Sequence, residues 1–258
     1  MHIETLGSGP SLVLLHGWAL HGGVFAPLVQ RLSDRYTLHL VDLPGHGHSR
    51  DSEVPLTLDA TVTAILARTP PAAWLAWSLG GLFALHAAAS SSQVRGLAMI
   101  AATPRFVRDG DWPHAVEGRV FAQFGDDLRN DYAGTLERFL ALDTMGSEHA
   151  RSELRTLKHD LYARGEPAPE ALQQGLHLLE QSDLRATLPA LSVPTLWLAG
   201  RRDLLVPAKA MQASAAVTPQ ATFVEIAGGG HAPFLGHADR VAADVDRFMQ
   251  ALPLGATA

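Results

Sequence analysis

Three polar residues, each placed shortly after an apolar run, could together make a hydroxyl group reactive. Ser78 follows AAWLAW, Asp203 comes shortly after TLWLAG, and His231 follows TFVEIA within GGGHAPF. A serine hydroxyl is a weak nucleophile near neutral pH, and it needs a base that a third group orients. These residues therefore predict nucleophilic catalysis, with Ser78 as nucleophile, His231 as base and Asp203 as the orienting acid.

The stretch AWSLGG around Ser78 predicts a sharp turn from a strand into a helix, which lifts one side chain clear of a sheet. Gly80 and Gly81 leave room for the backbone at such a turn. Ala76 stands where this pattern usually has its first glycine, and a serine followed by glycines can also be a simple helix cap. The order serine, aspartate, histidine along the chain favours the catalytic interpretation.

The base and the acid both have rivals in the sequence. His237 lies six residues after His231, but it is beyond the tight glycine turn. Asp109 and Asp111, which follow the run VRGLAMIAA, are the alternatives to Asp203. His231 and Asp203 are preferred because each is placed directly after a predicted strand.

The segment HGW at residues 16–18 follows the apolar run SLVLL. In a site of this kind, the loop after an early strand supplies one backbone N–H to the developing oxyanion, here that of Trp18. The residue after the nucleophile, Leu79, supplies the second N–H. The indole of Trp18 then either lines an acyl pocket or packs beneath a lid.

Two histidines in DLPGHGHS, His46 and His48, could be metal ligands. However, no further ligand stands at a fixed short spacing, and the chain contains no cysteine. The same stretch lacks the glycine fingerprint of a dinucleotide site and the lysine of a P-loop. We therefore predict no metal site and no cofactor.

Short apolar runs bounded by turn residues predict buried strands within residues 11–17, 36–45, 73–78, 94–102, 195–200 and 222–229. Predicted helices lie between the early strands, and a closing helix follows at 238–252. This alternation is typical of an α/β fold with a mostly parallel sheet and helices on both faces. Residues 104–188 contain no predicted strand, and their apolar residues recur at helical spacing. We therefore expect them to form a helical lid inserted into a core of residues 1–103 and 189–258.

The composition limits the classes of function. With 258 residues, 47% of them hydrophobic, the chain can form one large globular domain. The absence of cysteine removes disulfides and thiolate nucleophiles, and the net charge of −6 argues against a general nucleic-acid binder. No apolar run is long enough to span a membrane and no leader segment is evident, so we expect a cytoplasmic protein without membrane or nucleic-acid partners.

The motifs HGW, DLPGHGHS, the serine turn and GGGHAPF, in this order, resemble the α/β-hydrolase superfamily across nearly the whole chain. Within it, WLAWSLGGL, VDLPGHGHSR, TLERFLALDTMG and HAPF resemble the carboxylesterases that act on pimeloyl-acyl-carrier-protein methyl ester in biotin synthesis. The resemblance implies an esterase that needs no cofactor and has acyl carrier protein as its partner. It also implies substrate contacts at Trp18, Ser78, Leu79, Phe139, Leu140, Ala141, Leu142, Asp143 and His231.

Four basic residues of the expected lid could receive such a carrier protein, which is strongly acidic. Arg151, Arg155 and Lys158 are spaced to share one helical face, and Arg138 could lie nearby. A basic face would steer an acidic partner. The alternative is an ordinary solvated face, in which nearby glutamates, Glu148 and Glu153, pair with these side chains.

Two other functions remain open from the sequence. One is a broad carboxylesterase for free short-chain esters. The other is a non-catalytic relative that binds a ligand without turning it over. An aspartate-nucleophile hydrolase is disfavoured because position 78 is serine.

Overall fold

A seven-stranded sheet in the order β1-β3-β2-β4-β5-β6-β7 forms the centre of the molecule. The computed structural model describes residues 1–253, so the last five residues of the predicted core segment lie outside it. The strands are β1 His2–Leu6, β2 Ser11–Leu15, β3 Thr37–Asp42, β4 Ala72–Trp77, β5 Val94–Ile100, β6 Thr195–Gly200 and β7 Ala221–Ile226. All pairs are parallel except β1 with β3.

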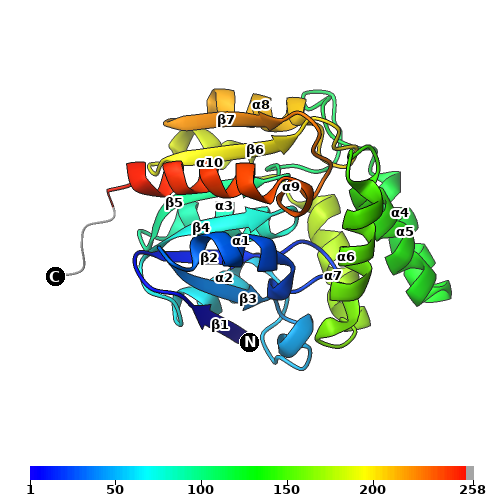
Figure 1. Cartoon of the computed structure of the whole chain (residues 1–258). Coiled ribbons are helices and arrows are strands. Elements are labelled where there is room, and N and C mark those ends of the chain that lie inside the picture. Colours follow the sequence, from blue (N-terminus) through cyan, green and yellow to red (C-terminus); the bar gives the residue numbers. More distant parts are fainter. Residues whose placement is uncertain (254–258) are drawn as a thin grey trace.

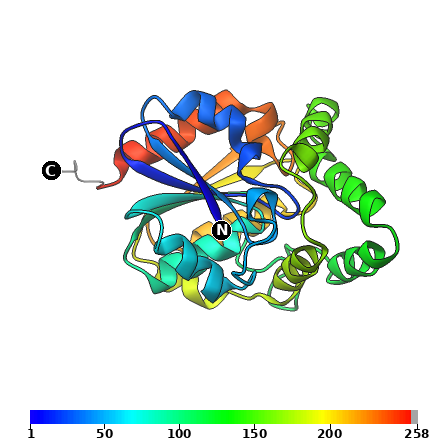
Figure 2. The same ribbon diagram turned by 90° about the horizontal axis from the view of Figure 1, so that it is seen from below.

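Helices cover both faces of this sheet, which confirms the predicted fold class (Figure 2). Helices α1 and α10 pack together on one face, and α2 and α3 on the other. The core helices are α1 Ala26–Leu32, α2 Leu58–Leu66, α3 Gly80–Ser90, α8 Ala208–Val217, α9 Pro233–Gly236 and α10 Ala238–Ala251. The sequence did not predict β1, a half-exposed edge strand, or the alanine-rich α8.

Four helices follow β5 and precede β6: α4 Arg119–Asn130, α5 Tyr132–Thr144, α6 Ala150–Ala163 and α7 Pro169–Gln181. They lie together beyond the carboxyl ends of the parallel strands (Figures 1 and 2). Local signals set their starts, because Asp131 accepts a hydrogen bond from the N–H of Gly134, and Pro169 occupies the first turn of α7. All four lie within residues 104–188, the segment predicted to form a lid.

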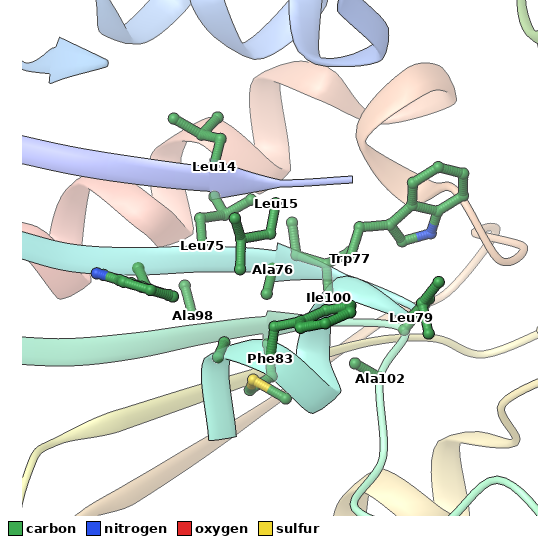
Figure 3. Packing of buried hydrophobic residues seen from close by; sticks show 14 of the residues in the cluster. Leu14, Leu15, Leu75, Ala76, Trp77, Leu79, Phe83, Ala98, Ile100 and Ala102 are labelled. Carbon is green, nitrogen blue, oxygen red and sulfur yellow. The ribbon is translucent and has the colours of Figure 1, made fainter. Parts of the chain in front are cut away.

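The buried apolar core lies between the sheet and its helices. Strands β4 and β6 are buried along their whole length, as central parallel strands require. Figure 3 shows Leu14, Leu75 and Ala76 from neighbouring strands packed together, with Phe83 of α3 nearby. This packing holds the end of β4 in a fixed position.

Polar contacts also join the lid to the core. Arg164, just after α6, contacts Asp42 at 3.2 Å, and it also pairs with Glu4 of β1. The indole N–H of Trp18 donates to the carbonyl oxygen of Leu172 in α7 at 2.9 Å. None of the helices in residues 1–253 combines the length and apolar character needed to cross a membrane.

Candidate active site

Ser78 occupies the turn between β4 and α3. Its φ is +53°, in the left-handed region that a residue with a side chain adopts at a cost of about 1–3 kcal/mol. Its N–H donates to the carbonyl oxygen of Ile100 at 3.1 Å, which ties the turn to β5. A Cβ atom at Gly80 would lie 2.6 Å from the carbonyl oxygen of Leu15, so this position requires glycine. The turn forms with Ala76 in place of the usual glycine, fully buried in β4.

The structure brings Ser78, His231 and Asp203 together from three distant parts of the chain. His231 Nε2 lies 2.8 Å from Ser78 Oγ, and His231 Nδ1 lies 2.8 Å from Asp203 Oδ2. All three residues are at least 96% buried. The distances fit a hydrogen-bonded chain in which an imidazole can take the serine proton while the carboxylate holds the ring.

Both carboxylate oxygens of Asp203 have hydrogen-bond partners. Its Oδ1 accepts hydrogen bonds from the N–H groups of Leu205 and Val206, both at 2.8 Å, while Oδ2 faces His231. Asp203 is thereby fixed in orientation before any substrate arrives.

The position of His231 is fixed from several sides. Its N–H donates to the carbonyl oxygen of Asp143 at 3.1 Å, and its own carbonyl oxygen accepts from the indole N–H of Trp77 at 2.8 Å. Burial opposes the charged imidazole, but the charge and the hydrogen bond of Asp203, together with the charge of Asp143, outweigh burial, so the pKa of His231 is raised. An imidazolium formed during a reaction is therefore stabilised at this site.

The rivals for these roles lie elsewhere. Asp109 pairs with Arg105 at 2.7 Å, and Asp111 pairs with Arg185 at 2.9 Å, both at the surface. His237 lies 3.5 Å from a carboxylate oxygen of Glu148 instead of facing the serine.

Two backbone N–H groups, those of Leu79 and Trp18, are predicted to hold a developing oxyanion. Leu79 immediately precedes α3, whose amino-terminal end carries a partial positive charge. Trp18 lies in the loop after β2, next to Ala19, whose φ of +67° marks a tight bend. Within residues 1–253, neither N–H donates to another backbone carbonyl outside the regular elements. Both remain available to a ligand oxygen.

The indole of Trp18 lies under the lid. Its ring centroid is 4.5 Å from that of Phe139 in α5, and a Cβ atom on Gly175 of α7 would collide with it. Together with the hydrogen bond to Leu172, these contacts bind the indole to two lid helices. Of the two roles expected for the indole, packing beneath these helices is the one that the structure shows.

Asp143, near the end of α5, is the most unusual group beside the triad. Its side chain is fully buried, and neither carboxylate oxygen has a hydrogen-bond partner within the described residues. Its Oδ1 lies 4.0 Å from His231 Nε2. Burial, reinforced by the nearby charge of Asp203, raises the pKa of Asp143 to about 7, although His231 opposes this shift.

Comparison with known proteins agrees with this geometry. The family model described as alpha/beta hydrolase fold matches residues 10–238. The chain belongs to this family. Proteins named pimeloyl-acyl-carrier-protein methyl ester esterase are similar to it over nearly their whole length. The one from Xanthomonas axonopodis pv. citri is 69% identical, covering 98% of this chain and 100% of that protein. The one from Stenotrophomonas maltophilia K279a is 67% identical, covering 98% and 97%.

Solved structures share the alpha/beta hydrolase fold at much lower sequence identity. An esterase from Exiguobacterium antarcticum superposes with a TM-score of 0.86 at 22% identity, covering 97% of this chain and 95% of that one. An enol-lactonase from Burkholderia xenovorans LB400 gives a TM-score of 0.84 at 20% identity, covering 96% of each chain. These likenesses establish the fold alone.

The other predicted contact residues of this hydrolase lie in α5. Phe139 and Leu140 are buried, and Ala141 and Leu142 are half-buried. Phe139, Leu140 and Asp143 lie on the inward side of α5, as their spacing of three and four residues requires, whereas Ala141 and Leu142 lie outside that side.

The four basic residues predicted to receive a carrier protein differ in exposure and in their ion pairs. Arg138 pairs with Asp131 at 2.9 Å and Asp127 at 3.4 Å. Lys158 pairs with Glu137 at 2.7 Å. By contrast, both Arg151 and Arg155 are exposed, and they line a shallow surface hollow with Glu148, His149 and Ser152.

The structure does not show the alternative in which Glu153 pairs with the neighbouring arginines. Its side chain points inward and is 2% exposed, so it cannot neutralise a solvent-facing cation. The helical period explains this, since Glu153 shares the inner side of α6 with the buried Leu157.

The loop that contains His46 and His48 also has a definite role in packing. His46 is fully buried, and its Nδ1 lies 3.0 Å from the carbonyl oxygen of Pro44. Burial lowers the pKa of His46 to about 4, so this ring stays neutral near pH 7. The backbone N–H of His48 donates to Asp42 at 2.9 Å.

Sequence reasoning missed the part that Trp77 plays in holding His231. Its position directly before Ser78 was visible, but the partner of its indole lies 154 residues away in the chain. It also missed the closeness of Asp143 to the imidazole. A lone acidic residue at the end of an apolar helix face, in FLALD, was the available signal.

Proposed function

We propose that this chain hydrolyses the methyl ester of pimeloyl-acyl-carrier protein, releasing methanol and the free pimeloyl carboxylate in biotin biosynthesis. The observation that carries the proposal is the hydrogen-bonded chain from Ser78 through His231 to Asp203, beneath a helical lid. The chain that contains these residues is 69% identical to a protein named for this activity. We place the enzyme with its carrier protein in the cytoplasm.

The reaction would occur in two halves. His231 takes the proton of Ser78 as the serine oxygen attacks the ester carbonyl, and Asp203 stabilises the imidazolium. The N–H groups of Leu79 and Trp18 hold the oxyanion, and each donor contributes about 3–4 kcal/mol to transition-state stabilisation. The protonated His231 then gives its proton to the methoxide oxygen, and methanol leaves. Water repeats the sequence on the acyl-enzyme, with His231 again acting as base.

Asp143 is placed to assist the oxygen that exchanges a proton with His231. A water or methoxy oxygen about 2.8 Å from both Asp143 Oδ1 and His231 Nε2 would fit the 4.0 Å gap between them. Such an oxygen would also provide a partner for a carboxyl group that otherwise has none. We therefore include Asp143 among the residues that position the leaving alcohol and the incoming water.

The inward side of α5 would contact the acyl chain. Phe139 and Leu140 lie above the triad region with almost no exposed surface, and Ser78 itself is 2% exposed. An acyl chain can reach Ser78 only if lid side chains or helices move. We propose that the observed arrangement is the closed form, and that residues 104–188 open as a lid.

The carrier protein would approach the lid face that Arg151 and Arg155 share. Both side chains are exposed and free to meet an acidic partner, whereas Arg138 and Lys158 already contact acidic side chains of the lid. An exposed ion pair contributes only about 0–1 kcal/mol, so the pairs made by Arg138 and Lys158 can exchange for pairs with a partner. Arg151 and Arg155 would supply most of the steering, with Arg138 and Lys158 contributing after docking.

The deciding experiment compares wild type with Ser78→Ala on purified pimeloyl-acyl-carrier-protein methyl ester. Wild type should release methanol and be labelled by a fluorophosphonate probe. Ser78→Ala should lose about 10⁵- to 10⁶-fold in kcat and all labelling, with an unchanged melting temperature. The same pair should differ in restoring biotin-free growth to a strain that lacks its own demethylating esterase.

Other outcomes would identify the alternative functions. Hydrolysis of free short-chain esters without activity on the carrier-bound ester would favour a broad carboxylesterase. A folded wild-type protein that is not labelled and releases no methanol would favour a non-catalytic binder.

A further inference from the structure

A second cluster of polar side chains lies where the lid meets the core, outside the triad. Glu148 and His149 immediately precede α6, and His237 lies between α9 and α10. Glu148 Oε1 is 3.5 Å from His237 Nε2 and 3.7 Å from His149 Nε2. One potential ligand atom from each of the three residues lies within 4.8 Å of the other two.

These separations are too long for direct hydrogen bonds, which have donor–acceptor distances of about 2.7–3.2 Å. They fit a shared metal ion better. Zinc binds His nitrogen and Glu oxygen at about 2.0–2.2 Å in a tetrahedral arrangement, which places neighbouring ligand atoms roughly 3.3–3.6 Å apart. The two distances measured from Glu148 Oε1 are therefore close to those of a formed site.

Buried polar groups around the cluster also lack partners. His237 Nε2 is inaccessible to solvent and has no hydrogen-bond partner within the described residues. Glu153 is 2% exposed; Ser147 and the backbone of Gly236 approach its carboxylate, but no hydrogen bond of standard geometry forms within the described residues. Side-chain atoms of Glu153 and His149 both crowd the position that a Cβ atom on Gly236 would occupy, so the carboxylate lies close to this imidazole.

A buried carboxylate without an opposite charge beside it is costly. A cation bound to His149 would place positive charge near Glu153. Carboxylates close to ligating histidines commonly have this supporting role in metal sites. One ion would thus give His237 a bond and Glu153 a compensating charge.

The backbone already holds the three residues in place. The N–H of Glu148 donates to the carbonyl oxygen of Gly228 at 3.1 Å, across the boundary between lid and core. The N–H of His237 donates to the carbonyl oxygen of Pro233 at 2.9 Å. Little ordering is therefore needed before an ion binds, which favours affinity.

We propose that Glu148, His149 and His237 bind one divalent transition-metal ion, best matched by Zn²⁺, and that this ion links the lid to the core. Two imidazoles and one carboxylate suit zinc and its neighbours in the transition series better than Mg²⁺ or Ca²⁺, which prefer oxygen ligands. The side chains of Glu148 and His149 are each 45% exposed, so a water molecule can complete the coordination.

The ion would act on the reaction through the lid. His237 follows His231 by six residues, while Glu148 and His149 begin the helix that contains Arg151 and Arg155. A bond between these segments would favour the closed arrangement. Bound metal should therefore raise the melting temperature and slow the hydrolysis of carrier-bound ester, with no part in the chemistry at Ser78.

The test measures metal binding directly, using protein from which any affinity tag has been removed. Zn²⁺ is titrated calorimetrically, and Co²⁺ is followed by the visible absorption bands of a tetrahedral site. Wild type should bind one equivalent with a dissociation constant in the micromolar range or below. His149→Ala and Glu148→Gln should each bind at least tenfold more weakly. His159→Ala, which removes an exposed histidine of the same helix α6, should bind like wild type.

Melting curves recorded without metal show whether each variant is folded, and Glu148→Gln keeps the test decisive if His149→Ala is not. Retention of wild-type affinity in a folded His149→Ala or Glu148→Gln variant would overturn the proposal, because the ion would then bind elsewhere, for example at His231. Absence of one-equivalent binding in wild type would overturn it as well. Neither result depends on the esterase activity.

Discussion

The two sides of the active site differ in how completely their polar groups are satisfied. On the core side, Asp203 accepts two backbone hydrogen bonds in addition to its contact with His231, and the backbone of His231 is held by Trp77. On the side of residues 104–188, the carboxylates of Asp143 and Glu153 are buried without a hydrogen bond of standard geometry among residues 1–253.

This difference separates the groups whose hydrogen-bond partners all come from the protein from the groups that require a bound oxygen or ion as a partner. A preorganised core side requires no rearrangement when charge develops on the imidazole and the oxyanion. Leaving a buried polar group unsatisfied costs about 1–3 kcal/mol, and more for a charged group, so such groups need an explanation. We explain Asp143 by the oxygen that reacts beside His231, and Glu153 by a cation at the lid boundary.

The largest expected effect comes from disturbing the core side. Asp203→Asn should lower kcat about 10⁴-fold, because an amide favours the wrong tautomer of His231 and cannot stabilise its charged form. Esterase kinetics on the carrier-bound ester and a melting curve measure the loss. Asp109→Asn, at the rival position that pairs with Arg105, is the matched control and should retain full activity. A comparable loss in this control would contradict the assignment of the acid.

A second expected effect tests the lid side through pH. The pKa of Asp143 is about 7 in the folded protein and 3.8 in its ordinary state, so between these values the folded protein binds more protons than the unfolded chain. The contribution of Asp143 to the free energy of unfolding then falls as the pH rises from about 4 to 7, and levels off above. Asp143→Asn should remove this decline. Between pH 4 and 7 the free energy of unfolding of the variant should therefore rise relative to that of wild type, by at most about 4 kcal/mol, because one pKa unit corresponds to about 1.4 kcal/mol. Denaturant unfolding at several pH values measures it.

The same variant should also change the pH profile of activity. The charge of Asp143 helps to raise the pKa of His231, which must be neutral to act as base. In Asp143→Asn the pKa of His231 should fall, and the acid limb of kcat/KM should move to lower pH. If the free energy of unfolding and the activity of wild type and Asp143→Asn depended on pH in the same way, the predicted titration of Asp143 would be contradicted.

The smallest expected effect concerns the outer face of the lid. Replacing both Arg151 and Arg155 with Glu should raise KM for the carrier-bound ester about 10- to 100-fold at low salt, with the difference shrinking as salt increases. Hydrolysis of a small p-nitrophenyl ester should be unaffected. Arg129→Glu, on the exposed side of α4, is the control for a general effect of charge. An equal change in KM for both substrates would contradict the proposed docking role of Arg151 and Arg155.

The core was largely predictable from the sequence because its signals are local. The six predicted strands all occur, each as an apolar run ended by turn residues, and the turn at Ser78 follows from its own glycines. The edge strand β1 lacked such a signal, because its residues are only half-buried. Helix α8 went unpredicted although its alanines favour helix.

Chain order and strand ends are enough to predict the fold class and the three residues that meet at the end of the sheet. Which charges are buried and which face solvent becomes visible once the chain is folded. The tertiary structure turned Glu153 inward, placed Asp143 beside an imidazole 88 residues away, and brought Glu148 and His149 to His237. The physical reason is that solvation and partners of a charge depend on packing between distant segments, which no local pattern records.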